Sequence, residues 1–234
     1  MKKFLLLTLI VSLCSLSFAA DEPAKESKAV DRVQAAADVL NEIESAPDKG
    51  IPQEVLGSAE CVAVVPSMLK GGFIVGAKYG RGLASCRTPK GWSAPAFFVV
   101  AGGSFGFQIG ASETDLILLV MTDRGADKLM QSKFTLGAEA SVAAGPVGRT
   151  ATAQTDVQMH AEILSWSRSQ GVFAGIALEG ATLREDLDDN AALYGSKLEN
   201  RDIVTDGRPA PASGAALIAL LNKYSAHERA AREQ

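Results

Sequence analysis

Glycines recur at every fourth residue inside two stretches that otherwise have the composition of β-strands. The first series is Gly72, Gly76 and Gly80, and the second is Gly102, Gly106 and Gly110. The residues between them are mostly β-branched or aromatic, the types that pack well on a pleated sheet. Because side chains alternate between the faces of a strand, an even spacing puts the glycines of one strand on one face. A face without side chains lets another backbone come close or lets the sheet bend, so the sequence predicts a curved or closed sheet.

Two other architectures fit part of this pattern. A small-xxx-small helix seam needs a long apolar helix, but Gly-Gly pairs and Pro95 interrupt these segments. An outer-membrane barrel needs girdles of interfacial aromatic residues, whereas aromatic residues make up only 6% of this chain and several helices are predicted. Both architectures are therefore set aside.

The rest of the chain alternates between helical and strand patterns. Apolar residues at helical spacing (Val30, Val33, Ala37, Leu40 and Ile43) predict an amphipathic helix over 30–43. Strands are predicted at 61–66, 71–80, 82–88, 95–101, 104–111, 114–122, 136–144, 147–155, 159–168 and 171–179. Helices are predicted from Pro52, over 123–130 and 186–194, and from Ser213. Strands in neighbour order with helices at both ends predict one α+β domain around a curved or barrel-like antiparallel sheet.

The N-terminus has the pattern of an export signal. Two lysines precede an apolar run, and Ser17 and Ala19 supply the small residues of a cleavage site. We therefore expect a signal peptide at 1–19, a flexible leader at 20–29, one domain at 30–226 and a polar tail at 227–234. The protein would then be periplasmic or secreted. Cys14 leaves an outer-membrane lipoprotein as the alternative, although Leu13 stands where such a signal has a small residue.

Charge and cysteine content narrow the function classes further. The formal net charge is −4, and loss of the two signal lysines makes it −6, so general nucleic-acid binding is not expected. Two cysteines would remain, Cys61 and Cys86. In an oxidising compartment such a pair predicts a disulfide. The alternative is two small buried thiols.

No recognisable catalytic, metal or cofactor site appears in the sequence. The run 102–106 matches G-x-S-x-G, but strand sequence follows Ser104 where a nucleophile elbow needs a helix. The acids Asp186, Asp188 and Asp189 lack the later ligands of a calcium loop, and a solvated helix start explains them better. Two separated cysteines and two distant histidines lack zinc-ligand spacing. We expect no enzyme activity, no metal and no cofactor.

Cations embedded in the glycine-rich strands and turns are the remaining candidates for a site. They are Lys70, Lys78, Arg81, Arg87, Lys90, Arg149 and Arg168. Clustered on one face, they could hold a lipid phosphate through charge-assisted hydrogen bonds. The alternative is ordinary solvated strand ends and cross-strand pairs with glutamates.

A series of short motifs in fixed order resembles the SYLF domain family over 30–194, nearly the whole mature chain. The motifs are Cys61-Val-Ala-Val-Val-Pro66, Lys70-Gly-Gly-Phe-Ile-Val-Gly76, Tyr79-Gly-Arg-Gly82, Gly91-Trp-Ser-Ala-Pro95, Gln108-Ile-Gly110, Gly145-Pro-Val-Gly-Arg149, Trp166-Ser-Arg-Ser169 and Gly171-Val-Phe-Ala-Gly-Ile-Ala-Leu-Glu-Gly180. The resemblance implies a membrane-lipid-binding module. Eukaryotic relatives bind phosphoinositides, partly through an N-terminal amphipathic helix, and some bind actin. Bacterial relatives are mostly exported proteins.

These observations together predict a non-enzymatic exported protein that binds anionic phospholipid at the cell envelope. The candidate lipid-binding residues are Lys70, Lys78, Arg81, Arg149, Arg168, Val30, Val33 and Leu40. The alternative is a structural protein whose glycine-rich sheet binds an envelope protein or a second copy of the chain. Actin is not expected as a partner of an exported chain.

Overall fold

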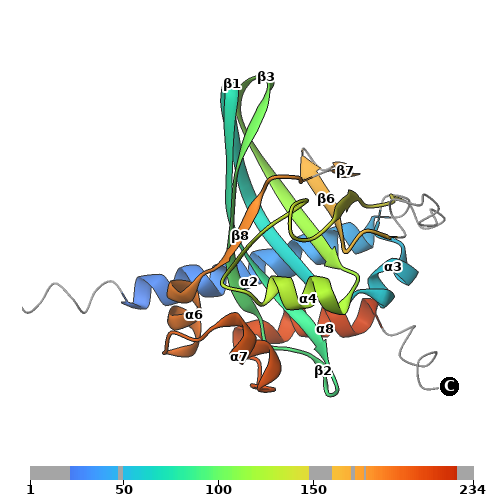
Figure 1. Cartoon of the computed structure of the whole chain (residues 1–234). Coiled ribbons are helices and arrows are strands. Elements are labelled where there is room, and N and C mark those ends of the chain that lie inside the picture. The colour runs from blue at the N-terminus through green and yellow to red at the C-terminus, as the bar shows by residue number, and fades with distance from the viewer. Residues whose placement is uncertain (1–21, 47–49, 148–159, 170–171, 177, 226–234) are drawn as a thin grey trace, which may run out of the picture.

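The computed structural model describes residues 22–46, 50–147, 160–169, 172–176 and 178–225. Within them, eight strands form one curled sheet and helices lie at both ends of the chain, as Figure 1 shows. The strands are β1 (Cys61–Thr88), β2 (Gly91–Trp92), β3 (Ala96–Val120), β4 (Lys133–Thr135), β5 (Val142–Ala144), β6 (Ile163–Ser169), β7 (Val172–Gly175) and β8 (Thr182–Glu185). The helices are α2 (Glu22–Ser45), α3 (Gln53–Ser58), α4 (Asp123–Leu129), α6 (Leu187–Tyr194), α7 (Asn200–Thr205) and α8 (Ala215–Tyr224), with a 3₁₀ turn at Ala212–Gly214. The predicted α+β class is confirmed.

The six strands predicted between 61 and 122 are two long strands, β1 and β3. They pair with each other as an antiparallel ribbon from Cys61↔Val120 to Ala84↔Ala96. The register shifts twice along the ribbon, between Val65 and Met68 and again between Gly72 and Ile74. Both ends of the ribbon lie at its base, and Figure 1 shows its middle, around the second register shift, rising clear of the rest of the domain; this part is called the outer end of the ribbon below.

The glycine-bearing face of β1 receives an earlier part of the same strand. A Cβ atom on Gly82 would lie 2.4 Å from the carbonyl oxygen of Val64, and one on Gly80 would lie 2.6 Å from the Val65 side chain. Residues 80–82 can meet residues 64–65 only if β1 folds back between them. The close approach and the curvature predicted from the glycines are thus confirmed. At these two glycines the chain itself fills the face that, in the alternative hypothesis, binds a partner protein.

A disulfide closes the base of the folded ribbon. Cys61 and Cys86 are bonded, with their Cα atoms 4.0 Å apart. Both side chains are buried. The predicted bridge therefore ties the first residue of β1 to a residue near the end of the same strand.

Two apolar clusters form the core on the two faces of the sheet. One cluster contains the inner face of α2 and of α8 with Phe97 and Trp166, and the other contains Phe98, Phe134 and Leu183. Because the ribbon alternates side chains between its faces, neighbouring residues such as Phe97 and Phe98 enter different clusters. Both clusters lie around the base of the ribbon.

The N-terminal helix is longer than predicted, and the expectation of a flexible leader is wrong over residues 22–29. The helix α2 begins at Glu22, and Ala29 is fully buried in it. Pro23 is compatible with this start because the first turn of a helix has no intrahelical partner for the missing N–H. The expected signal at 1–19 with Cys14, the strand at 147–155 beyond Val147, and the tail at 227–234 lie outside the described residues.

Several smaller features differ from the sequence-based expectation, among them the strands β2 and β4, which the sequence does not predict, and the strand predicted at 136–144, of which only β5 forms. The strands β5 and β6 are parallel, so the sheet is not wholly antiparallel. The strand β8 and the helix α7 are absent from that expectation, since both are too short for their hydrophobic pattern to show. The strand β8 pairs with β3 at Phe98–Ala101 and continues the sheet to β4.

Candidate functional site

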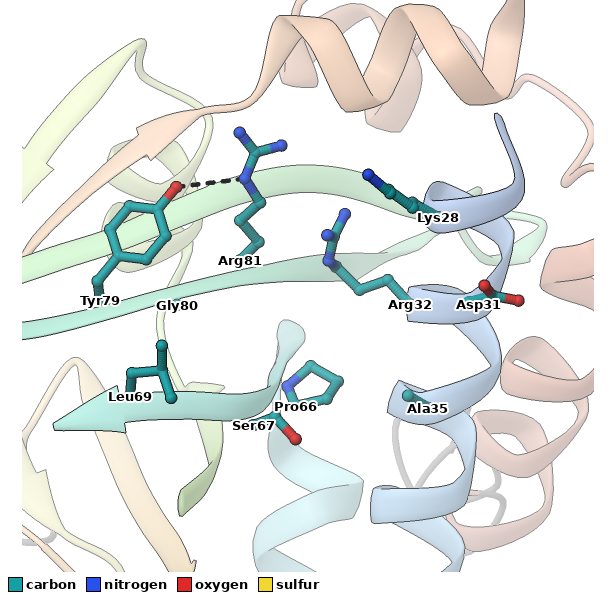
Figure 2. A pocket seen from close by; sticks show the side chains of 10 residues that line it. All are labelled: Lys28, Asp31, Arg32, Ala35, Pro66, Ser67, Leu69, Tyr79, Gly80 and Arg81. Carbon is teal, nitrogen blue, oxygen red and sulfur yellow. Dashed lines mark hydrogen bonds between the residues drawn. The ribbon is translucent and has the colours of Figure 1, made fainter. Parts of the chain in front are cut away.

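An open groove lies between α2 and the two halves of β1, near the point where the ribbon leaves the domain (Figure 2). It has a volume of about 410 Å³. Its lining residues are Lys28, Asp31, Arg32, Ala35, Pro66, Ser67, Leu69, Tyr79, Gly80 and Arg81. A second hollow of about 540 Å³ shares Leu69 and Tyr79 with the first and adds Lys70, Gly71, Ala77, Ser112 and Glu113. The two hollows adjoin at Leu69 and Tyr79 and are together called the groove below; Lys70 lines the second of them, whereas Lys78 lines neither.

Apolar side chains line the middle of this groove. Leu69 is 57% exposed and Tyr79 is 44% exposed, although both belong to a long strand with a buried base. A bulge at residues 66–67 precedes Leu69; there Ser67 has a positive φ of 51°, and its N–H donates to Asp115 Oδ1 at 2.9 Å. A bulge changes the direction of the strand and re-aims its side chains. Met68 consequently lies in the core while Leu69 faces the groove.

The candidate residues Lys70 and Lys78 lie close to each other, one before and one after the point where β1 folds back on itself. Burial lowers the pKa of Lys70. Burial also lowers the pKa of Lys78, and the positive charge of Lys70 lowers it further. The Lys78 side chain runs over the backbone of Gly102, where a Cβ atom would come within 2.9 Å of it. Within the described part of the chain, neither lysine makes an ion pair, so the pair is a half-buried positive site without a neutralising carboxylate.

Arg81, another candidate cation, lines the groove, but carboxylates already neutralise it. Its Nη1 atom lies 3.0 Å from Asp189 Oδ1 and 3.1 Å from Asp186 Oδ2. A hydrogen bond from Arg81 Nε to the Tyr79 hydroxyl at 3.2 Å, and then these carboxylates, raise the pKa of Arg81. The contact with Asp186 Oδ2 lacks hydrogen-bond geometry, so it is an electrostatic contact only.

Arg32 of α2 also pairs with Asp189. The acidic run starts a helix, α6, as expected, but Asp186 and Asp189 are buried, so the expectation that they are solvated is wrong. Asp186 caps α6 by accepting from the N–H of Asp189, and both carboxylates are buried. Burial raises the pKa of Asp189, and the two arginines oppose that change. This cluster holds α2, β1 and α6 together on one side of the groove.

Arg168 is engaged away from the groove lining. It pairs with Glu42 and Asp115, donating from Nε to Asp115 Oδ2 at 2.6 Å, and lies over the Phe173 ring at 5.6 Å. Since Asp115 also accepts from Ser67, Arg168 supports the bulge that shapes the groove. In this structure Arg168 therefore has protein partners and is not among the residues that line the groove.

The predicted helix residues are mostly buried. Val33 and Leu40 are fully buried in the core, and Val30 is partly exposed. In this structure Val33 and Leu40 do not face solvent, so they cannot meet a bilayer while α2 stays docked. Arg149 lies outside the described residues.

The groove also contains residues that sequence reasoning did not single out. Lys28 and Arg32 come from α2, and Leu69 and Tyr79 come from β1. The sequence signal for Leu69 is weak, because only the bulge turns it outward. Among the described residues, no cluster of His, Cys, Asp or Glu has the arrangement of a metal site. The described helices include none with the length and apolar character needed to cross a membrane.

Comparison with known protein families shows which family this chain belongs to. Residues 101–224 match the family model Ysc84, described as "Las17-binding protein actin regulator". This chain belongs to the Ysc84 family. The SYLF resemblance seen in the motifs is thereby confirmed.

Curated relatives of the Ysc84 family extend the match over most of the chain. SH3 domain-containing YSC84-like protein 1 of Rattus norvegicus is 36% identical over 181 residues, which cover 76% of this chain and 53% of the relative. The Xenopus laevis protein of the same name is 38% identical over 151 residues, covering 64% and 45%. LAS seventeen-binding protein 3 of Saccharomyces cerevisiae is 33% identical over 170 residues, covering 70% and 37%. The chain spans about half the length or less of these relatives.

The description of the Ysc84 family and the name of the yeast relative refer to binding, the family description adds regulation, and none of these names refers to an enzyme activity. The expectation that actin is not a partner is at odds with the family description, which contains the words "actin regulator". Actin therefore belongs among the partners to be tested.

Proposed function

We propose that this chain is a non-enzymatic, exported protein of the cell envelope that binds anionic phospholipid through the groove along β1. The supporting observation is the half-buried pair Lys70 and Lys78: Lys70 lines the groove with the exposed Leu69 and Tyr79, and Lys78 lies close to Lys70. A phosphodiester anion would relieve the mutual repulsion of the two ammonium groups, and apolar groups would cover the leucine and the tyrosine. Export is supported by the signal-like pattern of the first 19 residues.

The contribution of the lysine pair to binding has an expected size. A lysine close to an anionic membrane surface contributes about 1 kcal/mol, so two contribute about 2 kcal/mol, or on the order of 30-fold in affinity. The arginines of the groove contribute less, because Asp186 and Asp189 already neutralise them. The binding should weaken as salt screens the attraction.

Vesicle co-sedimentation tests the proposal. The protein should bind vesicles of phosphatidylcholine with phosphatidylglycerol at low salt and bind pure phosphatidylcholine vesicles much more weakly. The double variant Lys70→Gln/Lys78→Gln should lose about 30-fold in affinity. The charge-matched control Lys90→Gln/Lys133→Gln, at two exposed positions outside the groove, should bind like the wild type. No binding of the wild type to the anionic vesicles would end the proposal.

A protein partner is the second candidate, and the family description favours it. The groove would then receive an acidic surface of that partner. Co-sedimentation with filamentous actin and light scattering of the protein alone distinguish this candidate. Binding of actin that Lys70→Gln/Lys78→Gln abolishes, together with no binding to vesicles, would favour the protein partner.

A further inference from the structure

The outer end of the β1–β3 ribbon is free of charged residues. No Asp, Glu, Lys or Arg occurs between Lys70 and Lys78, nor from Gly102 to Ser112. The register brings the two segments together, with Gly72 opposite Gly110 and Val75 opposite Phe105. The apolar residues of the two segments are Phe73, Ile74, Val75, Phe105, Phe107 and Ile109.

This uncharged end projects from the domain, with the lysine pair at its base. Figure 1 shows the ribbon extending beyond the helices and the other strands. Lys70 and Lys78 precede and follow the fold in β1, and the register shift at Gly72/Ile74 marks the fold. At about 3.3 Å per residue, the ribbon extends on the order of 13 Å beyond Lys70. Half of a bilayer's hydrocarbon core is about 15 Å thick, so the projection could reach into one leaflet only.

We infer that the end of the ribbon, residues 71–77 and 102–112, enters the boundary between headgroups and acyl chains of an anionic leaflet, with Lys70 and Lys78 at the phosphates. This inference rests on the proposed function and adds how the membrane is engaged. The uncharged, apolar end of the ribbon would meet the acyl chains, and the two lysines at its base would meet the anionic phosphates. The order of these two parts along the ribbon thus matches the order of the layers in a leaflet. A soluble protein surface offers no such layering.

The backbone of the ribbon limits the depth of insertion. Between Ala101 and Asp115, β3 pairs only with β1 among the described residues, so within that part of the chain each of the two strands has one edge without a partner strand there. An unsatisfied backbone group in hydrocarbon costs several kcal/mol, which excludes the bilayer centre. At the boundary, water and headgroups can satisfy these edges. The expected depth is about 5–10 Å below the headgroups.

Quenching by brominated lipids tests the depth. Phe73→Trp places a reporter at the end of the ribbon, while the two native tryptophans, Trp92 and Trp166, are buried and out of reach of the bromines. With bound anionic vesicles, bromines at acyl carbons 6 and 7 should quench the reporter's emission at least about two-fold more than bromines at carbons 11 and 12. Leu187→Trp, on α6 in the body of the domain, is the control and should be quenched little by either lipid.

The outcomes separate this inference from the proposed function. Binding to anionic vesicles with no more quenching of Phe73→Trp than of Leu187→Trp would overturn the inference and leave the proposed function standing. Stronger quenching from carbons 11 and 12 would overturn the boundary position. No binding of the wild type would contradict the proposed function itself. Phe107→Trp, on the opposite strand, provides the same measurement if Phe73→Trp does not fold.

Discussion

The base and the outer end of the β1–β3 ribbon differ in the burial and the charge of their side chains. At the base, β1 and β3 lie between two apolar clusters, and the Cys61–Cys86 bridge and the close contact at Gly82 hold β1 against itself. Beyond the bulge, Leu69 and Tyr79 are exposed, and Lys70 and Lys78 lie close together with no ion pair to a carboxylate among the described residues. The difference teaches that the stability of the fold resides at the base, while the outer end keeps features that disfavour folding and favour a ligand.

Removing the disulfide should produce the largest change. In the chain-entropy model, a bridge that spans 25 residues stabilises by about 3–4 kcal/mol, so Cys61→Ala/Cys86→Ala should lower the free energy of unfolding by that amount. Urea denaturation measures it. Alkylation and mass spectrometry of the unreduced protein should leave both cysteines unmodified. Alkylation of both cysteines, or an unfolding free energy that does not change in the double variant, would contradict a stabilising disulfide at the base of the ribbon.

Substitution of single glycines should distinguish the two ends of the ribbon. Gly82→Ala places a Cβ atom 2.4 Å from the Val64 carbonyl oxygen and should destabilise by about 2–3 kcal/mol. Gly103→Ala is the matched control, because its Cβ would lie 4.0 Å from the Gly76 carbonyl oxygen, an ordinary van der Waals distance. It should change stability by less than about 0.5 kcal/mol in urea denaturation. Equal effects at the two sites would show that the strand does not fold back on itself.

The lysine pair should show a smaller effect on stability, opposite in sign to its effect on binding. Because the pKa of each lysine is lowered in the folded protein, the charged forms disfavour folding at neutral pH. Lys70→Gln/Lys78→Gln should therefore raise Tm by about 1–3 °C at pH 7, a small shift because both side chains remain half exposed.

The lowered pKa values of the two lysines also predict how the Tm difference between the double variant and the wild type depends on pH. As pH rises through the window between the lowered pKa values and the ordinary 10.5, the folded wild type releases these protons before the unfolded chain does. The Tm advantage of the double variant should therefore shrink toward pH 10.5. A double variant that is less stable than the wild type at pH 7 would show that the lysines have partners which stabilise the fold.

The sequence predicts features that depend on the spacing of nearby residues, such as strand curvature and helix amphipathicity. It does not predict contacts between segments that are far apart along the chain. The glycine spacing predicts a close approach, but it cannot identify the approaching strand as β1 itself. The apolar stripe of α2 is correct, yet whether core or bilayer covers Val33 depends on tertiary packing. The sequence suggests a solvated Asp189 because its partners, Arg32 and Arg81, lie 157 and 108 residues away along the chain. The exposure of Leu69 depends on a bulge that has no clear sequence signature.

Hydrogen–deuterium exchange with and without anionic vesicles tests most directly whether the outer end of the ribbon is the membrane-binding region. Vesicles should slow exchange in residues 66–81 and 102–112 and leave β6 and α8 unchanged. Slowed exchange confined to other segments, with the outer half of the ribbon exchanging as in the free protein, would contradict the account.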